Sequence, residues 1–340
     1  MKNVIYISSF DPINNLNIND IKEFNDSNTK FFLVLPYSKF SSLKDRESMV
    51  KLALNDLNVN YEVDSALNEK YMYSIDLVEL FNKYKSSGID NLYLLVHDEK
   101  PLLLNEEKIL KFKMKFNLKD NCTNLSHDIR DLRNLSTTEP VIEYIIRNNL
   151  YFMKVIEQYI NGHRLNHSIS VAKTAYKIAS NNKLSRPDEY FIAGLLHDIG
   201  KHINEVDSLN YMEKYYRNYI DMPPWSYHQF IGAFLAKQLF PNISDNIYNA
   251  ILTHCTGNKN MSPIQKVIYA SDKIEPTRGY DSASMIRHCE ENYSEGFIEV
   301  LKENIKFLNE NSGNPSNNKL TKCCLDCYLN NKLEENDKNE

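Results

Sequence analysis

The first third of the chain alternates short β-type apolar runs with stretches of helical periodicity. The β-type runs cover residues 4–8, 31–35, 59–63, 92–96 and 111–116. Between them, apolar residues recur at helical spacing over 43–54 and over 75–81. Strands that alternate with helices are typical of β-α-β crossovers around a parallel sheet. The pattern therefore predicts an α/β domain.

From about residue 140 onward the apolar residues follow only the 3.6-residue helical period. Apolar positions at helical spacing cover 141–146, 171–179 and 192–196, and no convincing strand follows. The boundary is expected between residues 135 and 155, where Pro140 stands near a helix start. We therefore predict domains at 1–150 and 151–328. The polar, charged end of the chain predicts a disordered tail over 329–340.

Composition and charge narrow the class of protein. The 340 residues carry a formal net charge of −5, and a pI of about 6.0 gives no reason to expect a nucleic-acid partner. No apolar run approaches the roughly 18 residues of a membrane span, and the apolar start is too short for a signal peptide. We expect a cytosolic protein without a membrane partner. The sequence leaves a homodimer open.

The six cysteines are too sparse and too clustered for a disulfide framework. Cys323, Cys324 and Cys327 lie close together near the end, but a structural zinc site needs about four ligands and no second pair is nearby. These residues are expected to be reduced thiols on the last helix.

Candidate metal ligands gather in the helical half. An adjacent His-Asp pair ends an apolar run, and further ligand-type side chains stand beside small or apolar helix positions, where an unpaired polar group is costly. The complete set is His167, His197, Asp198, His228, His254 and Asp272. Four imidazoles and two carboxylates suffice for two octahedral divalent metals bridged by one carboxylate, with positions left for water and a phosphate.

The motifs around these residues resemble a known superfamily. The segments RLNH at 164–167, LLHDIGK at 195–201 and SD at 271–272 are similar to the HD-domain phosphohydrolases. The segments THCTG at 253–257 and YASDKIEPTR at 269–278 resemble its YqeK family of symmetric diadenosine tetraphosphate hydrolases. This resemblance implies an all-α HD-domain fold over about residues 150–325.

The resemblance also implies a reaction and its cofactor. A dinucleoside tetraphosphate would be cleaved in the middle to two ADP by a metal-bound water, with two ions of iron, or else manganese or cobalt. Asp198 would bridge the ions and act catalytically. His167, His197 and Asp272 would complete one site, with His228 and His254 at the other.

Further residues are candidates for substrate binding. Lys201 and Arg278 are the cations assigned to the polyphosphate, and Lys201 is counted with Asp198 as catalytic because leaving-group charge must be neutralised. Thr256 and Gly257 would let the backbone approach the substrate; the alternative for Gly257 is a helix C-cap. The remaining imidazoles of His163, His202 and His288 are expected to be peripheral.

The α/β domain has a resemblance of its own. The segment ISSFDPINNLN at 7–17 looks like the phosphate-handling loop of the nicotinate-mononucleotide adenylyltransferases (NadD-like), which have a Rossmann-like nucleotidyltransferase fold. Further matches are DRESMVKLA at 45–53, YSID at 73–76 and VIEYIIRNNLY at 141–151. The family's later Ser-Ser-Thr-x-x-Arg-type signature survives only as LSHDIR at 125–130.

The loop departs from that family at the residues that carry its chemistry. Its two histidines are Asn14 and Asn17 here, the glycine between them is Leu16, and the leading glycines are Ile7 and Ser8. An amide has neither the charge nor the proton equilibrium of an imidazole. We therefore expect the first domain to keep its fold and to lack catalysis.

Three alternatives stay open from the sequence. The first domain could retain adenylyl transfer, so that the chain is bifunctional in NAD biosynthesis. The HD domain could hydrolyse a different nucleotide. The chain could also be a nucleotide-binding scaffold without turnover, although an intact ligand set argues against that.

Overall fold

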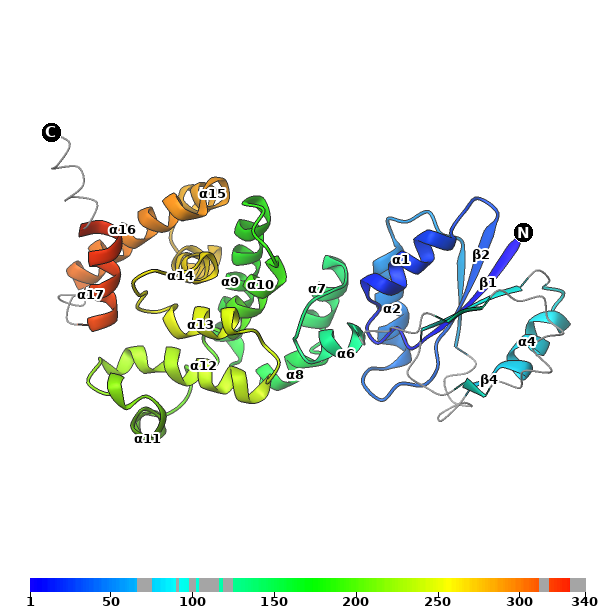
Figure 1. Ribbon diagram of the computed structural model, residues 1–340, viewed down its shortest axis with the longest axis horizontal. Helices are drawn as coiled ribbons and strands as arrows, with labels where there is room; N and C mark the ends of the chain where they lie inside the picture. The colour runs from blue at the N-terminus through cyan, green and yellow to red at the C-terminus, as the bar shows by residue number, and fades with distance from the viewer. Residues whose placement is uncertain are drawn as a thin grey trace. The chain divides into compact units, whose positions relative to one another are not determined.

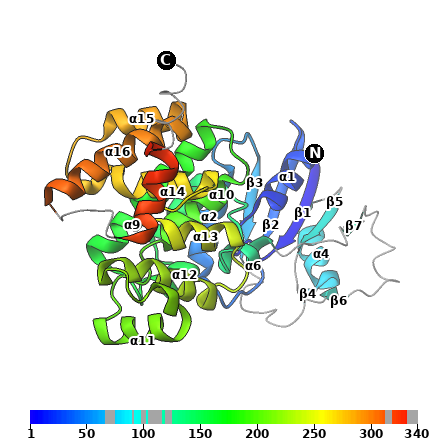
Figure 2. The ribbon, with the colours of Figure 1, turned by 60° about the vertical axis from the view of Figure 1, so that its left-hand side comes forward.

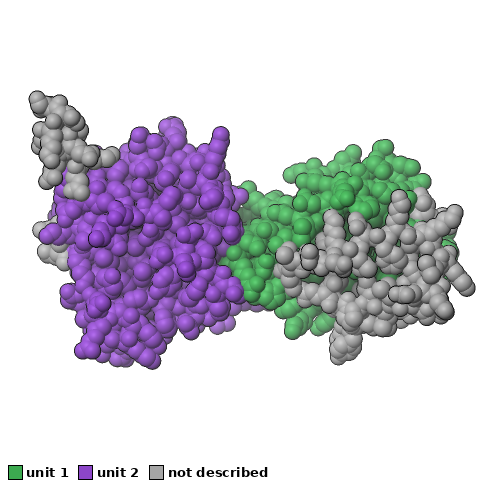
Figure 3. Space-filling view, in the orientation of Figure 1, with its two compact units in different colours: residues 1–153 green, residues 154–340 purple. Residues whose placement is uncertain are grey.

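The protein is described by a computed structural model that covers residues 1–65, 75–89, 92–97, 102–103, 116–118, 125–311 and 318–330. The chain divides into unit 1, Met1–Met153, and unit 2, Lys154–Glu340 (Figure 3). The sequence placed the boundary at 150/151. Each unit is described by itself below.

Unit 1 is built on a parallel sheet, as the alternating pattern predicts. Its strand order is β3-β2-β1-β5-β7, and each neighbouring pair is parallel (Figure 1). The strands are β1 (Lys2–Ser8), β2 (Thr29–Val34), β3 (Tyr61–Asp64), β5 (Leu92–His97) and β7 (Phe116–Leu118). A separate parallel pair joins β4 (Ile75–Asp76) to β6 (Leu102–Leu103).

The strand order reverses beside β1. The chain moves outward through β2 and β3 on one side of β1, and then returns to β5 and β7 on the other side. In open α/β sheets, ligands bind at such a switch point, outside the carboxyl ends of the strands. The loop that follows Ser8 lies at this position, so the fold places the NadD-like segment where a nucleotide site would be expected.

The helices of unit 1 begin with capping residues that the sequence supplies. Asn14 caps α1, and Ser42 caps α2 with Asp45 in a capping box. The helices are α1 (Asn15–Phe24), α2 (Leu43–Leu54), α4 (Leu77–Ser86), α6 (Leu125–Arg130), α7 (Glu139–Arg147) and α8 (Phe152–Ile156), the last of which crosses the boundary between the units. Buried residues of the strands and α4, such as Ile7, Val34 and Phe81, form one core.

Unit 2 is helical throughout its described residues, which confirms the predicted all-helical half. Its helices are α9 (Gly162–Asn181), α10 (Pro187–Leu196), α11 (Glu205–Tyr215), α12 (Tyr227–Leu239), α13 (Asp245–Thr253), α14 (Pro263–Ile274), α15 (Ala283–Glu291), α16 (Tyr293–Asn311) and α17 (Lys319–Leu325). Short turns η1 (Arg217–Tyr219), η2 (Pro224–Ser226), η3 (Pro276–Arg278) and η5 (Asp326–Asn330) join or extend them. Helices α9, α10, α13 and α14 pack together (Figures 1 and 2).

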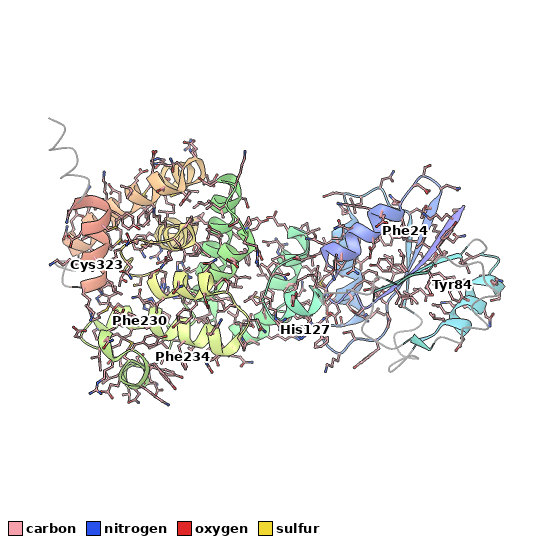
Figure 4. All side chains as sticks on the ribbon, in the orientation of Figure 1. Phe24, Tyr84, His127, Phe230, Phe234 and Cys323 are labelled. Carbon is pink, nitrogen blue, oxygen red and sulfur yellow. The ribbon has the colours of Figure 1, made fainter. Side chains whose placement is uncertain are left out.

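Aromatic contacts fasten the outer helix α11 and turn η1 to α12. Phe234 on α12 stacks on Tyr215 with ring centroids 4.4 Å apart, and Phe230 stacks on Tyr219 at 4.8 Å. Figure 4 labels both phenylalanines on this helix. The contacts fix the start of α12, where one of the candidate ligands lies.

Two close backbone contacts set the spacing of the inner helices. A Cβ built on Gly194 of α10 would lie 2.7 Å from Ala172 Cα of α9. One built on Gly200 would lie 2.7 Å from the Gly232 nitrogen of α12. Since real Cβ atoms do not approach so closely, only glycine permits these helices to approach to this distance.

Some predicted elements differ from those observed. Ile75 was placed in a helix, but it lies in β4 and the helix begins at Leu77. The predicted strand over 111–116 falls mostly outside the described residues, and β7 covers Phe116–Leu118. Residues 329 and 330 belong to η5 rather than to a tail, and residues 331–340 lie outside the described part. Among the described helices, none is long and apolar enough to cross a membrane. The cytosolic location stays a prediction.

We expect Gly194→Ala to destabilise unit 2 by about 1–3 kcal/mol, because overpacking outweighs the gain in helix propensity. The measurement is urea unfolding followed by the fluorescence of Trp225, the chain's single tryptophan, which reports on unit 2. Ser180→Ala, on the exposed face of α9, is the control and should shift stability by less than about 0.5 kcal/mol. An unchanged or higher midpoint for Gly194→Ala would contradict the close packing.

Candidate metal centre

The candidate ligands come from helices that are far apart in the sequence. His167 lies on the buried face of α9, and His228 lies in the first turn of α12. His197 and His254 are the C-cap residues of α10 and α13. The structure brings them together around two carboxylates, Asp198 directly after α10 and Asp272 on α14, and all six side chains are buried.

Asp198 stands between two sets of imidazoles. Its Oδ1 lies 3.4 Å from His228 Nε2 and 3.6 Å from His254 Nε2. Its Oδ2 lies 3.5 Å from His197 Nε2 and 3.9 Å from His167 Nε2. The two oxygens of one carboxylate thus face different pairs of ring nitrogens.

Asp272 lies closest to one of these sets, although its ligand oxygen is also within 4.8 Å of the His254 ring nitrogen. Its Oδ1 lies 3.2 Å from His167 Nε2 and 3.6 Å from His197 Nε2. Two cations also contact the carboxylate: Arg278 Nη2 lies 2.5 Å from Oδ1, and Lys273 Nζ lies 3.0 Å from Oδ2. Asp272 therefore joins the side of the centre that Asp198 Oδ2 faces.

Backbone carbonyls fix the orientation of three of the rings. The Nδ1 atoms of His197, His228 and His254 lie 2.7 Å from the carbonyl oxygens of Gly194, Trp225 and Ile251. Because a carbonyl only accepts, each Nδ1 carries the proton and donates it. Lys201 Nζ also lies 3.4 Å from His228 Nδ1, but the shorter carbonyl contact decides the tautomer. His167 is oriented instead by Glu275, whose Oε1 lies 2.8 Å from its Nδ1.

This arrangement leaves imidazole lone pairs facing each other. His228 Nε2 and His254 Nε2 lie 3.1 Å apart, and with both protons on Nδ1 neither ring can donate to the other. His197 Nε2 is buried and has no hydrogen-bond partner among the residues that the structure describes. A cation between such atoms removes the repulsion, and rings held at Nδ1 by carbonyls or carboxylates are typical of metal-binding histidines.

The donor set fits divalent metal ions. Overlapping groups of candidate ligand atoms, such as those of His167, His197 and Asp198, lie within 4.8 Å of one another. Imidazole and carboxylate donors suit iron, manganese, cobalt and zinc alike, so the residues define the class of ion and not its identity.

Protonation in the cluster follows burial and charge. Burial lowers the pKa of His228 to about 3 and also lowers the pKa of His254. Burial acts to raise the pKa of Asp198, but the imidazoles of His197 and His254 hold it well below the usual range. Asp272 is held low chiefly by Lys273 against the same effect of burial. Burial acts to lower the pKa of His197 as well, but Asp198 and Asp272 raise it above the usual value. Since neutral rings and ionised carboxylates are the forms that bind a metal, His228, His254 and the two carboxylates are in the binding form, and a metal would compete with a proton at His197.

A cavity of about 260 Å³ opens onto the centre. Both carboxylates line it together with the cations of Arg164, Lys201, Lys273 and Arg278. The other lining residues are Trp225, His228, Cys255, Thr256, Tyr269, Asn304, Leu308 and Thr321. The surplus of cationic side chains over carboxylates makes the cavity suited to a polyanion.

The predicted substrate residues do not all reach this cavity. Lys201, Arg278 and Thr256 line it, although the Thr256 hydroxyl is buried and bonded to Gln229. Gly257 is not among the lining residues. Its φ of +66° requires glycine, and a Cβ there would lie 2.7 Å from Cys324 Sγ, so backbone conformation and packing against α17 account for it. The alternative of a helix C-cap does not hold, since the C-cap of α13 is His254.

Three residues of the site were not predicted as functional. Arg164 donates to Asp198 Oδ2 over 2.7 Å, and Lys273 and Glu275 contact Asp272 and His167. Arg164 precedes His167 by three positions, which places both on one helix face, so periodicity could have found it. Lys273 and Glu275 lie in the segment 269–278 that resembles the YqeK family, but no role is predicted for them from the sequence.

The peripheral residues lie as the sequence places them. His163 and His202 are exposed, and His288 contacts Glu299. Cys323, labelled on α17 in Figure 4, is exposed, whereas Cys324 is buried. None of the clustered donor groups found in the described residues includes the cysteines of α17 and η5.

The loop after β1 uses its polar side chains to hold unit 1 together. The Asn14 side chain accepts from the backbone of Leu16 and Asn17 and donates to Ser126 over 3.0 Å. Asn17 donates to the Tyr6 hydroxyl over 2.9 Å.

The same loop also contains a buried carboxylate, Asp11, whose oxygens accept hydrogen bonds. The Asp11 carboxylate accepts from Ser38, from Ser41 over 2.5 Å and from Tyr151. The polar side chains of the loop named here are thus engaged within the protein.

Comparison with known proteins agrees with this division. A family model described as HD domain matches residues 164–277, so unit 2 contains an HD domain. The class defined by fold and site is a parallel α/β domain followed by a helical HD domain with a candidate metal centre.

Particular relatives cover one or both units. "Probable nicotinate-nucleotide adenylyltransferase/Ap4A hydrolase" of Mycoplasma genitalium is 26% identical over 88% of this chain and 97% of its own. "Bis(5'-nucleosyl)-tetraphosphatase, symmetrical" of Bacillus subtilis is 29% identical over 45% of this chain and 83% of its own. A solved "predicted HD superfamily hydrolase involved in NAD metabolism" from Clostridium acetobutylicum is 26% identical over 48% of this chain and 89% of its own, with a TM-score of 0.44.

Asp198→Asn should lose bound metal, because the amide removes the charge that both ligand sets share. Metal content after dialysis is the measurement, with far-UV circular dichroism to show that the helices remain. His163→Ala and His202→Ala, at exposed histidines near the motifs, are matched controls and should retain metal. Full metal content in Asp198→Asn would show that the centre lies elsewhere.

Proposed function

We propose that unit 2 hydrolyses diadenosine tetraphosphate symmetrically to two ADP. The observation that carries the proposal is the buried Asp198 carboxylate, with one oxygen facing His228 and His254 and the other facing His167 and His197. The names of the relatives of unit 2 support the same substrate.

The ligand atoms fall into two sets around Asp198. His167, His197 and Asp272 would hold one ion, His228 and His254 the other, and Asp198 would bridge them. When bound, divalent ions supply a water-derived nucleophile and neutralise charge on the attacked phosphate. Iron is the expected metal, with manganese or cobalt as alternatives.

The chain's own cations would hold the polyphosphate. Lys201 is placed beside His228, where its charge can stabilise the ADP that leaves. Arg278 and Lys273 contact Asp272, and Arg164 contacts Asp198, so each cation lies next to a proposed metal ligand. These four would align the two central phosphates with the ions.

The overall reaction consumes one water. The water oxygen becomes bonded to one of the two central phosphorus atoms, and the bond from that phosphorus to the oxygen between them breaks. The leaving ADP keeps the bridging oxygen, and the water gives up its protons. Each product carries one adenosine and two phosphates, so ADP is the sole nucleotide product.

Unit 1 is proposed to contribute no adenylyl transfer. The positions of the two imidazoles are taken by Asn14 and Asn17, whose amides cap α1 and bind Tyr6. Loss of a single electrostatic donor in a transition state costs about 100- to 1000-fold in rate. The name of the M. genitalium relative includes that activity, so the assay below has an arm for it.

The test incubates the full chain, supplied with iron, manganese or cobalt, with diadenosine tetraphosphate and separately with ATP plus nicotinate mononucleotide. Chromatography should show ADP alone from the first mixture and no dinucleotide from the second. Asp198→Asn should lower the rate at least about 100-fold. AMP and ATP as products would contradict symmetric cleavage, and a dinucleotide with pyrophosphate would contradict the inactive first domain. An inert protein that retains metal would point to another nucleotide, whereas one that binds nucleotide without metal would be a scaffold.

Asn14→Ala should destabilise unit 1 by about 1 kcal/mol through loss of the helix cap and leave diadenosine tetraphosphate hydrolysis unchanged. Thermal unfolding and the hydrolysis rate are measured on the same preparation. Asn14→Ser keeps a capping oxygen and should restore most of the stability. A large loss of hydrolysis in a folded Asn14→Ala protein would tie unit 1 to the reaction.

A further inference from the structure

We propose that Trp225 is the stacking surface for a nucleobase at the mouth of the metal cavity. The proposal rests on the proposed function in its choice of a nucleotide as ligand. It concerns binding of the base, and its test does not require turnover.

Trp225 is tied to the centre through the backbone. It belongs to η2, three residues before His228, and it lines the cavity. Residues three apart on a tight helical turn lie on the same side. The Trp225 carbonyl also accepts a hydrogen bond from His228 Nδ1 over 2.7 Å. Trp225 therefore orients the His228 ring through its backbone and provides the indole through its side chain.

The indole of Trp225 is open to solvent, although tryptophan has the largest side chain of the apolar residue types. Trp225 is 51% exposed, and within the described residues its indole makes no hydrogen bond or ring contact. Tyr280 and Phe307 are exposed to a similar degree, but they do not line the cavity. Trp225 is therefore both exposed and part of the cavity lining.

The turn that carries Trp225 is rigid. Pro223 and Pro224 precede it and fix the backbone angle φ at two successive positions. The Ser226 hydroxyl donates to the Pro223 carbonyl over 2.7 Å. A fixed aromatic face binds a planar ligand without first losing conformational entropy.

The size and the lining of the cavity indicate that a nucleobase would lie outside it. Its volume of about 260 Å³ is below the roughly 300–1,000 Å³ of sites that enclose a whole small ligand. Cations and carboxylates line it, which suits phosphates and metal ions rather than an apolar ring. A nucleoside joined to those phosphates would therefore lie at the mouth.

The second large aromatic side chain of the lining is not available for stacking. Tyr269 is only 1% exposed, and Lys273 Nζ lies 4.2 Å from its ring centroid. Among the described lining residues, Trp225 is thus the large aromatic ring with an open face. Bases stack on such rings whatever their identity, so the site should accept guanine as well as adenine.

The direct test uses the fluorescence of the metal-loaded full chain, because Trp225 is its single tryptophan. ADP should quench the emission on binding, and GDP should do the same. Inorganic tripolyphosphate, which has the charge but no base, should bind without quenching. Equal quenching by ADP and tripolyphosphate, or no quenching by bound ADP, would overturn the proposal.

A second measurement uses equilibrium dialysis with ADP. Trp225→Ala should weaken ADP binding about 5- to 150-fold, and Trp225→Phe should recover most of the affinity. Neither variant should change the affinity for tripolyphosphate, which also shows that the cavity remains folded. Tyr176→Ala, at an exposed aromatic of α9 that does not line the cavity, is the matched control and should bind ADP normally.

The outcomes separate this proposal from the proposed function. Quenching by ADP in a protein that does not cleave diadenosine tetraphosphate would refute only the reaction. Symmetric cleavage with unaltered ADP affinity in Trp225→Ala would refute only the stacking. Absence of any ADP binding would overturn both.

Discussion

The buried carboxylate of Asp198 is the constraint on which unit 2 depends. A charge in the interior is tolerated only with partners, and here imidazoles from separate helices and the Arg164 guanidinium surround it. The glycines at 194, 200 and 232 permit the helices to approach closely enough for those partners to reach it. The same short segments of chain therefore determine both how the helices pack and where the ligand atoms lie.

Periodicity and motif spacing predicted much of this architecture. Alternating strands and helices indicated the parallel sheet, and the candidate ligands lie around one centre. Which oxygen of Asp198 faces which ring could not be predicted, because it depends on how five helices cross. The role of Gly257 could not be predicted either. A glycine that packs against Cys324 of α17 cannot be distinguished in the sequence from a glycine that contacts a ligand.

In unit 1 the polar side chains at the switch point are engaged in hydrogen bonds within the fold. The positions at the switch point still carry polar side chains, but Asn14 and Asn17 satisfy the backbone of α1 and the hydroxyl of Tyr6. The buried Asp11 carboxylate is likewise satisfied by hydroxyl groups. Hydrogen bonds that stabilise the fold occupy the amide donors of Asn14 and Asn17, which are the groups in these side chains that could donate to a phosphate, so stability and anion binding compete at this loop.

The spread of the ligands along the chain also has a consequence for biosynthesis. His167 and Asp272 contact the same part of the centre, yet over one hundred residues separate them. On the ribosome, α9 and α10 emerge well before α14, so their buried imidazoles and carboxylate remain unmatched until α14 has been synthesised. A metal ion can therefore meet its complete ligand set only after that point in translation.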